Sequence, residues 1–295
     1  MMLAKTIGLE LAYETFGEGE AILLISGLGT QMIRWDDAFC GALAARGYCV
    51  IRFDNRDAGL STHLSHEPAP DFGTLAAALM AGERPAVPYS LLDMATDAVG
   101  LLDALGVERA HVVGRSMGGM IAQCMATEFP DRVLSLTSVM SGTGNPAMPQ
   151  AAPDVMALMQ RPKPDPAADP EGFATASLAF ARRIAGGGAE FDAVAQKALA
   201  LEEARRAHDP AGFGRQLAAM ATAGDRRAKL ATLTLPVLVI HGADDPLIPP
   251  ECGADTAASI PGAELLLVEG MGHDIPQPFH ARIIDAIQGV ARRTA

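Results

Sequence analysis

Residues 110–120 of this chain read AHVVGRSMGGM. The apolar, β-branched residues Val112 and Val113 predict a buried strand. The residues after Gly118 mix apolar and polar types at helical spacing until a proline ends the run. A strand, a tight turn and a helix with Ser116 at the apex form the pattern of a nucleophile elbow, which lifts a serine hydroxyl clear of a sheet.

Steric crowding explains the two glycines of the G-R-S-M-G motif. The turn crowds the strand against the helix, so neither Gly114 nor Gly118 has room for a Cβ. The alternatives are an ordinary glycine-rich turn or a phosphate-binding turn. The second is disfavoured because neither a lysine nor a G-x-G-x-x-G motif follows.

The rest of the chain alternates short apolar runs with helical patterns. We expect one or two antiparallel strands within 5–16, and further strands at 21–26, 48–54, 133–141, 236–242 and 263–270. Helices are predicted at 34–46, 73–81, 90–106, 251–259 and 279–292. Because the central strands are apolar without alternation, the pattern predicts an α/β fold whose mostly parallel sheet of about eight strands is covered on both faces.

One long block interrupts this alternation. Residues 143–225 contain no convincing strand and carry helical patterns at 172–185, 189–207 and 211–222. The block predicts a helical insertion after the sixth strand, which leaves residues 1–142 and 226–295 as the core. Its apolar side chains either line a substrate pocket or pack the insertion against itself; the pocket candidates are Met156, Met159, Phe180 and Phe213.

A serine nucleophile needs a base, and the chain has seven histidines. His273 lies in EGMGHDIP, a loop just past the last predicted strand, and such loops meet the elbow at the carboxyl edge of a parallel sheet. It is therefore the predicted base. The other six lie in an irregular loop, in strands, in the insertion or in the last helix: His63, His66, His111, His208, His241 and His280.

The base in turn needs an orienting acid at the same edge. The loop HGADDPLIPP offers Asp244 and Asp245, and the proline at 246 fixes an extended shape for the residue before it. We expect Asp245 to be the acid, with Asp244 as the alternative. The rival position, after the strand at 133–141, reads SGTGN and holds no carboxylate.

Two backbone donors are expected to bind the oxyanion. One is the N–H of Met117, and the other is the N–H of Leu28 in the turn SGLGT, where Gly27 permits close approach. Met32 and Trp35, which follow that turn, are added to the predicted pocket together with Gly27.

The chain resembles the α/β-hydrolase superfamily over nearly its whole length. The segments that carry the resemblance are LLISGLG, FDNRDAGLS, VVGRSMGGMIAQ, LVIHGADDPLIP and GMGHDIP. The NRDAGLST and GMGHD segments are similar to the branch with aclacinomycin-type methylesterases and bacterial carboxylesterases. The resemblance implies an α/β-hydrolase fold, a triad of Ser116, Asp245 and His273, oxyanion donors at Leu28 and Met117, and a cap formed by the insertion.

Two further points follow from the resemblance. Many members carry His-Gly at the oxyanion loop, whereas this chain has Ser26 and Gly27, so the side chain that stiffens the loop differs. In the superfamily the arginine and aspartate of an NRDAGLS-like loop brace that loop, which implies structural roles for Arg56 and Asp57.

Composition narrows the class of partner and compartment. A net charge of −12 argues against nucleic acid and anionic membrane as partners. The sequence predicts no signal peptide and no transmembrane helix, and its four scattered cysteines fit free thiols, so we expect a cytoplasmic protein. Neither a metal nor a cofactor is expected, and the chain can be a monomer or a homodimer.

These observations favour a serine hydrolase that cleaves small to medium apolar carboxylic esters. The same triad also supports C–C bond hydrolysis, perhydrolysis, lactone opening and acyl transfer. A dehalogenase is disfavoured because that chemistry needs a carboxylate where Ser116 stands. A hypothesis of another class is a ligand-binding, receptor-like hydrolase fold with little turnover. The insertion also holds basic residues that can bind a carboxylate, so a carboxylated half-ester is an alternative substrate.

Overall fold

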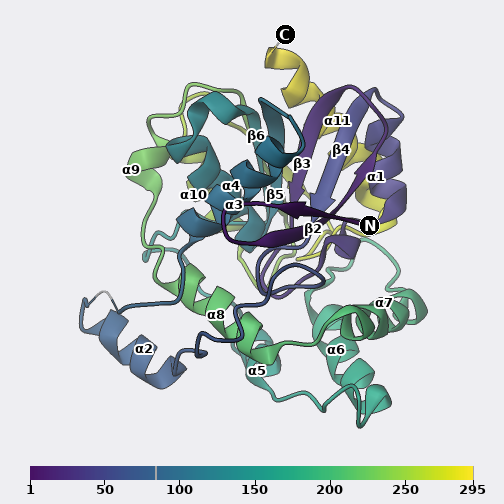
Figure 1. Cartoon of the computed structure of the whole chain (residues 1–295), viewed down its shortest axis with the longest axis vertical. Helices are drawn as coiled ribbons and strands as arrows, with labels where there is room; N and C mark the ends of the chain where they lie inside the picture. The colour runs from purple at the N-terminus through teal and green to yellow at the C-terminus, as the bar shows by residue number, and fades with distance from the viewer. Residues whose placement is uncertain (84, 295) are drawn as a thin grey trace.

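The computed structural model describes residues 1–83 and 85–294, and its centre is one eight-stranded sheet (Figure 1). The spatial order is β1-β2-β4-β3-β5-β6-β7-β8. The β1–β2 and β2–β4 pairs are antiparallel and all others are parallel, which confirms the predicted mostly parallel sheet. The strands are β1 (Met2–Lys5), β2 (Glu10–Phe16), β3 (Glu20–Ile25), β4 (Tyr48–Phe53), β5 (Ala110–Arg115), β6 (Val133–Val139), β7 (Val237–Gly242) and β8 (Glu264–Val268).

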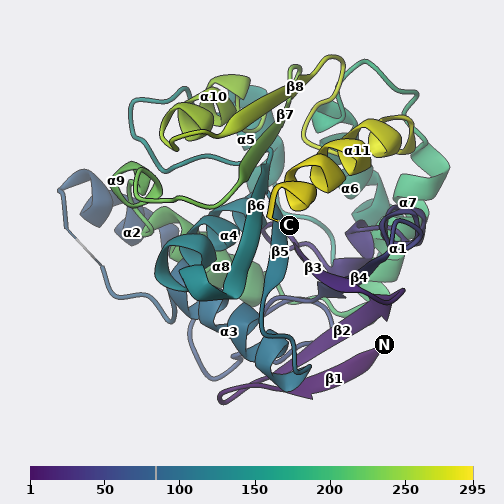
Figure 2. The same cartoon turned by 90° about the horizontal axis from the view of Figure 1, so that it is seen from above.

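Helices cover both faces of the sheet, as Figure 2 shows from above. One face packs against α3 (Leu91–Ala104) and α4 (Met117–Glu128), with α10 (Pro250–Ala258) on the same side. The other packs against α1 (Asp37–Ala44) and α11 (His280–Ala291). In β3, successive side chains enter opposite layers, and all are buried after Glu20. Burial on both faces explains why this strand reads as an unbroken apolar run.

Capping side chains determine where α1 and α3 begin. Ser90 and Asp93 make the reciprocal capping box expected for α3. The predicted helix at 34–46 starts later, because the side chain of Asp36 caps α1 by accepting from the Phe39 amide at 2.7 Å. The residues before it form a 3₁₀ turn, η1 (Met32–Arg34). Three more 3₁₀ turns are η2 (Pro130–Arg132), η3 (Gln277–Phe279) and η4 (Arg292–Thr294).

Four helices occupy residues 143–225, the predicted insertion, and gather on one side of the molecule in Figure 1. They are α5 (Pro153–Gln160), α6 (Pro170–Ile184), α7 (Ala193–Arg206) and α8 (Pro210–Ala221). The described residues of this segment form no strand, as the sequence predicts. Two short helices lie outside it, α2 (Phe72–Met80) and α9 (Arg227–Leu230); α5 and α9 are not predicted by the sequence pattern. No helix among the described residues has the length and apolarity needed to cross a bilayer.

Parallel strands bring their following loops to one edge of the sheet. The loops after β3, β5, β7 and β8 carry, in that order, Leu28, Ser116, Asp245 and His273. The topology therefore collects the predicted site residues from four separate stretches of sequence.

Candidate active site

Ser116 sits at the tip of the turn between β5 and α4, in a conformation that few side chains adopt. Its backbone has φ 55° and ψ −124°. A positive φ at a non-glycine residue costs of order 1–3 kcal/mol and is found mainly at functional sites. The amide of Ser116 donates to the Val139 carbonyl at 2.9 Å, which holds the turn against β6. Ser116 is partly exposed although Arg115 and Met117 on either side are buried.

The flanking glycines are required by backbone contacts. A Cβ on Gly114 would collide with the carbonyl of Gly118. A Cβ on Gly118 would collide with the carbonyl of Ile25 and lie 2.7 Å from that of Ser26. Gly118 thus brings the start of α4 against the end of β3. The elbow and the predicted oxyanion loop are consequently in direct backbone contact.

Asp245 and His273 meet at the same edge. His273 Nδ1 lies 2.7 Å from Asp245 Oδ2, and both side chains are buried. The other carboxylate oxygen, Oδ1, accepts the backbone amides of Leu247 and Ile248, each at 2.9 Å. Burial opposes ionisation of this carboxyl, but the His273 ring, His241 and the Ile248 amide outweigh it and hold the pKa of Asp245 well below its usual range. Asp244, the alternative acid, is exposed.

His241 is a neighbour of this pair that sequence reasoning did not single out. The ring is fully buried, and its Nε2 lies 2.8 Å from the Ile248 carbonyl and 3.5 Å from Asp245 Oδ2. Its position four residues before Asp245, at the end of β7, is the only sequence signal for this contact. A carbonyl can only accept, so Nε2 is the donor in this bond, and within the described chain Nδ1 has no hydrogen-bond partner.

The remaining histidines lie in other surroundings. His111 contacts Ser135 and Glu20, and His280 contacts the Ile275 carbonyl. His63 contacts Asp209, whereas His66 and His208 are exposed. None of these contacts involves Ser116, Asp245 or His273.

The predicted oxyanion loop lies next to the serine. A Cβ on Gly27 would lie 3.1 Å from Ser116 Cβ and 3.6 Å from its Oγ, so this glycine faces the hydroxyl. Within the described residues the amides of Leu28 and Met117 donate to no protein acceptor. Met117 is also the first residue of α4, where the amides point out of the helix with its positive dipole end.

Side chains from the core and from α8 brace that loop. The side-chain Nδ2 of Asn55 donates to the Ser26 carbonyl at 3.0 Å, and Ser26 Oγ donates to the Gln31 carbonyl at 3.5 Å. The amide of Gly29 donates to Gln216 Oε1 at 2.8 Å. The ring of Phe213 packs so closely on Gly29 that a Cβ there would lie 2.5 Å from Phe213 Cδ2. The α8 helix therefore contacts the loop that carries Leu28.

Arg56 and Asp57 lie in a network of buried ion pairs. Arg56 contacts both carboxylate oxygens of Asp97 on α3, at 2.6 and 2.7 Å. Asp57, with φ 63°, accepts two bonds from Arg215 on α8, each at 2.8 Å. It also accepts from Tyr89. Burial would raise the pKa of Asp57, but Arg215, Tyr89 and a backbone amide lower it overall. These contacts tie the loop after β4 to α3 and α8.

One group of potential metal ligands is present in the described part of the chain: Asp57, His63 and Asp209, with ligand atoms within 4.8 Å of one another. The Arg215 guanidinium already contacts both carboxylates, at 2.8 Å and 3.2 Å. A fixed cation between these oxygens opposes the binding of a metal ion by charge repulsion.

The predicted pocket residues differ in how deeply they are buried. Met32 and Trp35 are buried, and the Trp35 ring packs on Phe39 with centroids 5.3 Å apart. The side chains on α5 and α6, namely Met156, Met159 and Phe180, are partly exposed.

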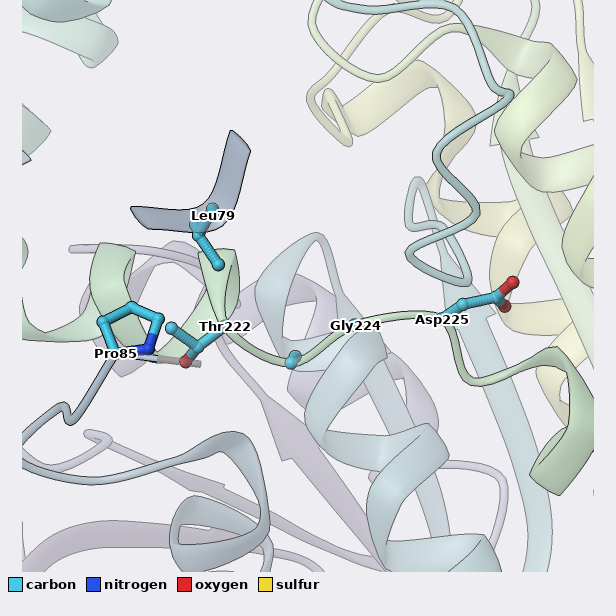
Figure 3. A pocket seen from close by; sticks show the side chains of 6 residues that line it. Leu79, Pro85, Thr222, Gly224 and Asp225 are labelled. Atoms are coloured by element: carbon cyan, nitrogen blue, oxygen red, sulfur yellow. The ribbon is translucent and has the colours of Figure 1, made fainter. Parts of the chain in front are cut away.

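A surface pocket of about 290 Å³ lies elsewhere, between α2 and the turn after α8, where Figure 3 shows it. Its lining includes Leu79, Pro85 and Asp225 and none of the predicted site residues.

A second, partly buried polar cluster lies beside the elbow and was not predicted. Arg115, which precedes the serine, contacts Asp274, which follows the histidine, at 3.2 Å. Burial disfavours the charged carboxylate of Asp274, yet Arg115 and Arg34 lower its pKa overall. Arg34 in turn contacts Glu203 on α7 at 2.6 Å. Because these residues are far apart in sequence, only the folded chain reveals the cluster.

This arrangement can be compared with known proteins. A family model described as the alpha/beta hydrolase fold matches residues 20–276. The chain belongs to the α/β-hydrolase family. Among relatives of this hydrolase, rhodomycin D methylesterase DauP of Streptomyces sp. strain C5 is 32% identical over 90% of this chain and 89% of its own length. Rhodomycin D methylesterase DnrP of Streptomyces peucetius is 30% identical with the same coverage.

Solved structures agree on the fold. The enol-lactonase from Burkholderia xenovorans LB400 matches with a TM-score of 0.72 and 22% identity, covering 99% of this chain and all of that one. The esterase EaEST from Exiguobacterium antarcticum matches with a TM-score of 0.73 and 19% identity, covering 99% of each chain. At these identities the likeness concerns the α/β-hydrolase architecture and not the substrate.

Proposed function

We propose that this hydrolase is a serine esterase that cleaves carboxylic esters through an acyl-enzyme. Ser116 is the nucleophile, His273 the general base and Asp245 the orienting acid. The observation that carries the proposal is the convergence of three features at one sheet edge: a strained, partly exposed serine, a loop glycine facing its Oγ, and a buried aspartate–histidine pair. The methylesterase names of two relatives at 30–32% identity support the same class of reaction.

In the proposed mechanism, Ser116 Oγ attacks the acyl carbon while His273 Nε2 takes its proton. Asp245 accepts from Nδ1, which fixes the tautomer that leaves Nε2 free. No hydrogen bond joins Ser116 and His273 among the described residues, and in this proposal the contact tightens when substrate binds. The imidazolium then protonates the leaving alcohol, and a water activated by His273 releases the acid.

The developing oxyanion is bound by the Leu28 and Met117 amides. Their lack of a protein acceptor supports this role, because donors already engaged would have to break a bond first. Replacing both interactions with water would cost several kcal/mol, since one such donor contributes about 3–4 kcal/mol in a well-studied protease.

We further propose that residues 143–225 form a cap over a core made of 1–142 and 226–295. Contacts of α8 with the oxyanion loop and of α7 with Arg34 support this division. In the proposal, Gly27, Met32, Trp35, Met156, Met159, Phe180 and Phe213 line the passage to the serine. An apolar lining favours small to medium esters with an uncharged acyl group.

The same site could serve another triad reaction, such as C–C hydrolysis, perhydrolysis, lactone opening or acyl transfer. A receptor-like role with little turnover is the alternative of another class. Free thiols at all four cysteines support a reducing, cytoplasmic location.

The test is a panel of p-nitrophenyl esters of increasing acyl length beside carboxylated half-esters. We expect steady turnover of uncharged esters and a loss of kcat of about 10³-fold or more in Ser116→Ala with the fold intact. Retained activity in that variant would refute the mechanism. Turnover of half-esters alone would refute the apolar-substrate proposal, and a single burst without turnover would favour the receptor-like role.

A further inference from the structure

The loop that carries His273 lies between two other loops. We define the base loop as residues 269–273. On one side lies the loop of the acid, where the Asp244 amide donates to the Met271 carbonyl at 3.0 Å. Gly242, at the end of β7, has no room for a Cβ because Met271 and the Gly272 carbonyl occupy that space. This side of the base loop is therefore packed backbone against backbone.

The other side of the base loop is covered by the insertion. We define the glycine turn as residues 184–188, the end of α6 and the three glycines after Ala185. The amide of His273 donates to the Ile184 carbonyl at 2.6 Å, and that of Gly272 donates to the Ala185 carbonyl at 3.1 Å. In return, the amide of Gly188 donates to the Gly270 carbonyl at 2.8 Å.

Glycines on both sides make this approach possible. A Cβ on Gly188 would lie 2.7 Å from Gly270 Cα, and one on Gly270 would lie 2.5 Å from Gly188 Cα. A Cβ on Gly272 would lie 2.5 Å from the Gly186 nitrogen. The space is closed to any side chain from either direction, so the two backbones touch over several residues.

The acceptors in this contact are carbonyls at the carboxyl end of α6. Such carbonyls have no partner within their helix and carry the negative end of the helix dipole. Two of them bind the base loop, at His273 itself and at the residue before it. The contact therefore fixes the backbone from which the imidazole projects.

We infer that the glycine turn positions His273, so that the orientation of the base depends on where the insertion lies. The inference rests on the proposed role of His273. The acid loop orients the imidazole through Asp245, and the glycine turn fixes the main chain of the same residue from the opposite side. Displacing the turn moves the base relative to Ser116 without removing any group that touches substrate. A misplacement of about 1 Å lowers the rate by about 100-fold.

The test compares two alanine substitutions in one turn. Gly188→Ala introduces a Cβ against Gly270, whereas Gly187→Ala is the matched control, because its Cβ would meet only Asp244 Oδ2 at 4.0 Å. Neither residue has a positive φ, so both accept alanine without backbone strain. We expect kcat per titrated active site to fall about 10- to 100-fold in Gly188→Ala with KM within about threefold, and Gly187→Ala to match the wild type.

Amide hydrogen exchange of Gly272 and His273 gives a second measurement that needs no activity. Protection in the wild type, lost by about tenfold or more in Gly188→Ala and kept in Gly187→Ala, supports the inference. Rapid exchange of both amides in the wild type would overturn it, whether or not Gly188→Ala folds. Loss of protection in Gly188→Ala with unchanged kcat would also overturn it. If the wild-type protein hydrolyses no ester, the proposed function is refuted. That outcome is measured on the wild type alone and does not depend on Gly188→Ala.

Discussion

Replacing Asp245 with asparagine changes one atom and should nearly abolish turnover. The reason lies in the two backbone amides that donate to Oδ1, those of Leu247 and Ile248. They need an acceptor, so an asparagine is held with its carbonyl oxygen toward them and its NH₂ toward His273. Nδ1 of His273, 2.7 Å from that position, must then accept instead of donate. The imidazole carries its proton on Nε2 and no longer takes a proton from the serine.

The expected magnitude follows from that loss of the correct tautomer. In a serine protease the equivalent change lowers kcat by about 10⁴. For this hydrolase we expect a loss of 10³ to 10⁴, or about 4–5 kcal/mol of activation free energy. Substrate binding does not use Asp245, so KM should change by less than about threefold.

The assay is steady-state hydrolysis of a p-nitrophenyl ester, with active sites titrated to correct for unfolded protein. Asp244→Asn is the control, because it removes the same charge one residue away from an exposed position. It should keep kcat within about twofold. More than a tenth of wild-type kcat in Asp245→Asn, or equal losses in the two variants, would refute the argument that Asp245 orients the base.

Three further predictions concern the buried Asp57–Arg215 pair and the packing of the elbow glycine. Asp57→Ala leaves the buried Arg215 guanidinium without its main partner, and we expect a loss of about 3–5 kcal/mol in urea denaturation. Because the pKa of Asp57 lies below the ordinary 3.8, its pair stabilises the fold fully above that value and loses the contribution as pH falls through the folded-state pKa. The difference in free energy of unfolding between the wild type and Asp57→Asn should therefore become smaller below about pH 4. A difference that does not change with pH would contradict this prediction. Gly118→Ala pushes a Cβ into the carbonyls of Ile25 and Ser26, and we expect insoluble protein or less than about 1% of activity in a solubility and ester assay. Soluble Gly118→Ala with normal kcat would contradict the elbow geometry.

The sequence predicts the centre of the sheet well because the central strands are buried on both faces. Such strands read as unbroken apolar runs, as in β3, and their ends fall within a few residues of the predicted ranges. The capping box of α3 is equally local, since Ser90 and Asp93 lie three residues apart. The four-residue helix α9 is too short to show a helical period, and α5 lies between the proline-rich stretches PAMPQAAP and RPKPDP, which read as irregular structure.

The contacts between distant segments are the part that sequence reasoning cannot supply. The loop order brings Asp245 and His273 to one sheet edge, but their separation is known only from the fold. The Arg115–Asp274 pair joins residues that are 159 positions apart, and no local pattern marks it. Gly186 and Gly188 lie between two predicted helices in a stretch with no pattern that marks a contact, whereas in the fold they pack against the base loop. Their meaning depends on a partner backbone more than 80 residues away, which a single sequence does not reveal.

Trapping the proposed acyl-enzyme shows which residue attacks the ester. Wild-type protein treated with a fluorophosphonate, or quenched in acid during turnover of a p-nitrophenyl ester, is digested and mapped by mass spectrometry. The proposed function predicts one adduct per chain on Ser116, absent from Ser116→Ala and slow to form in His273→Ala. An adduct on another residue, or ester turnover that continues with Ser116 unmodified, would contradict it.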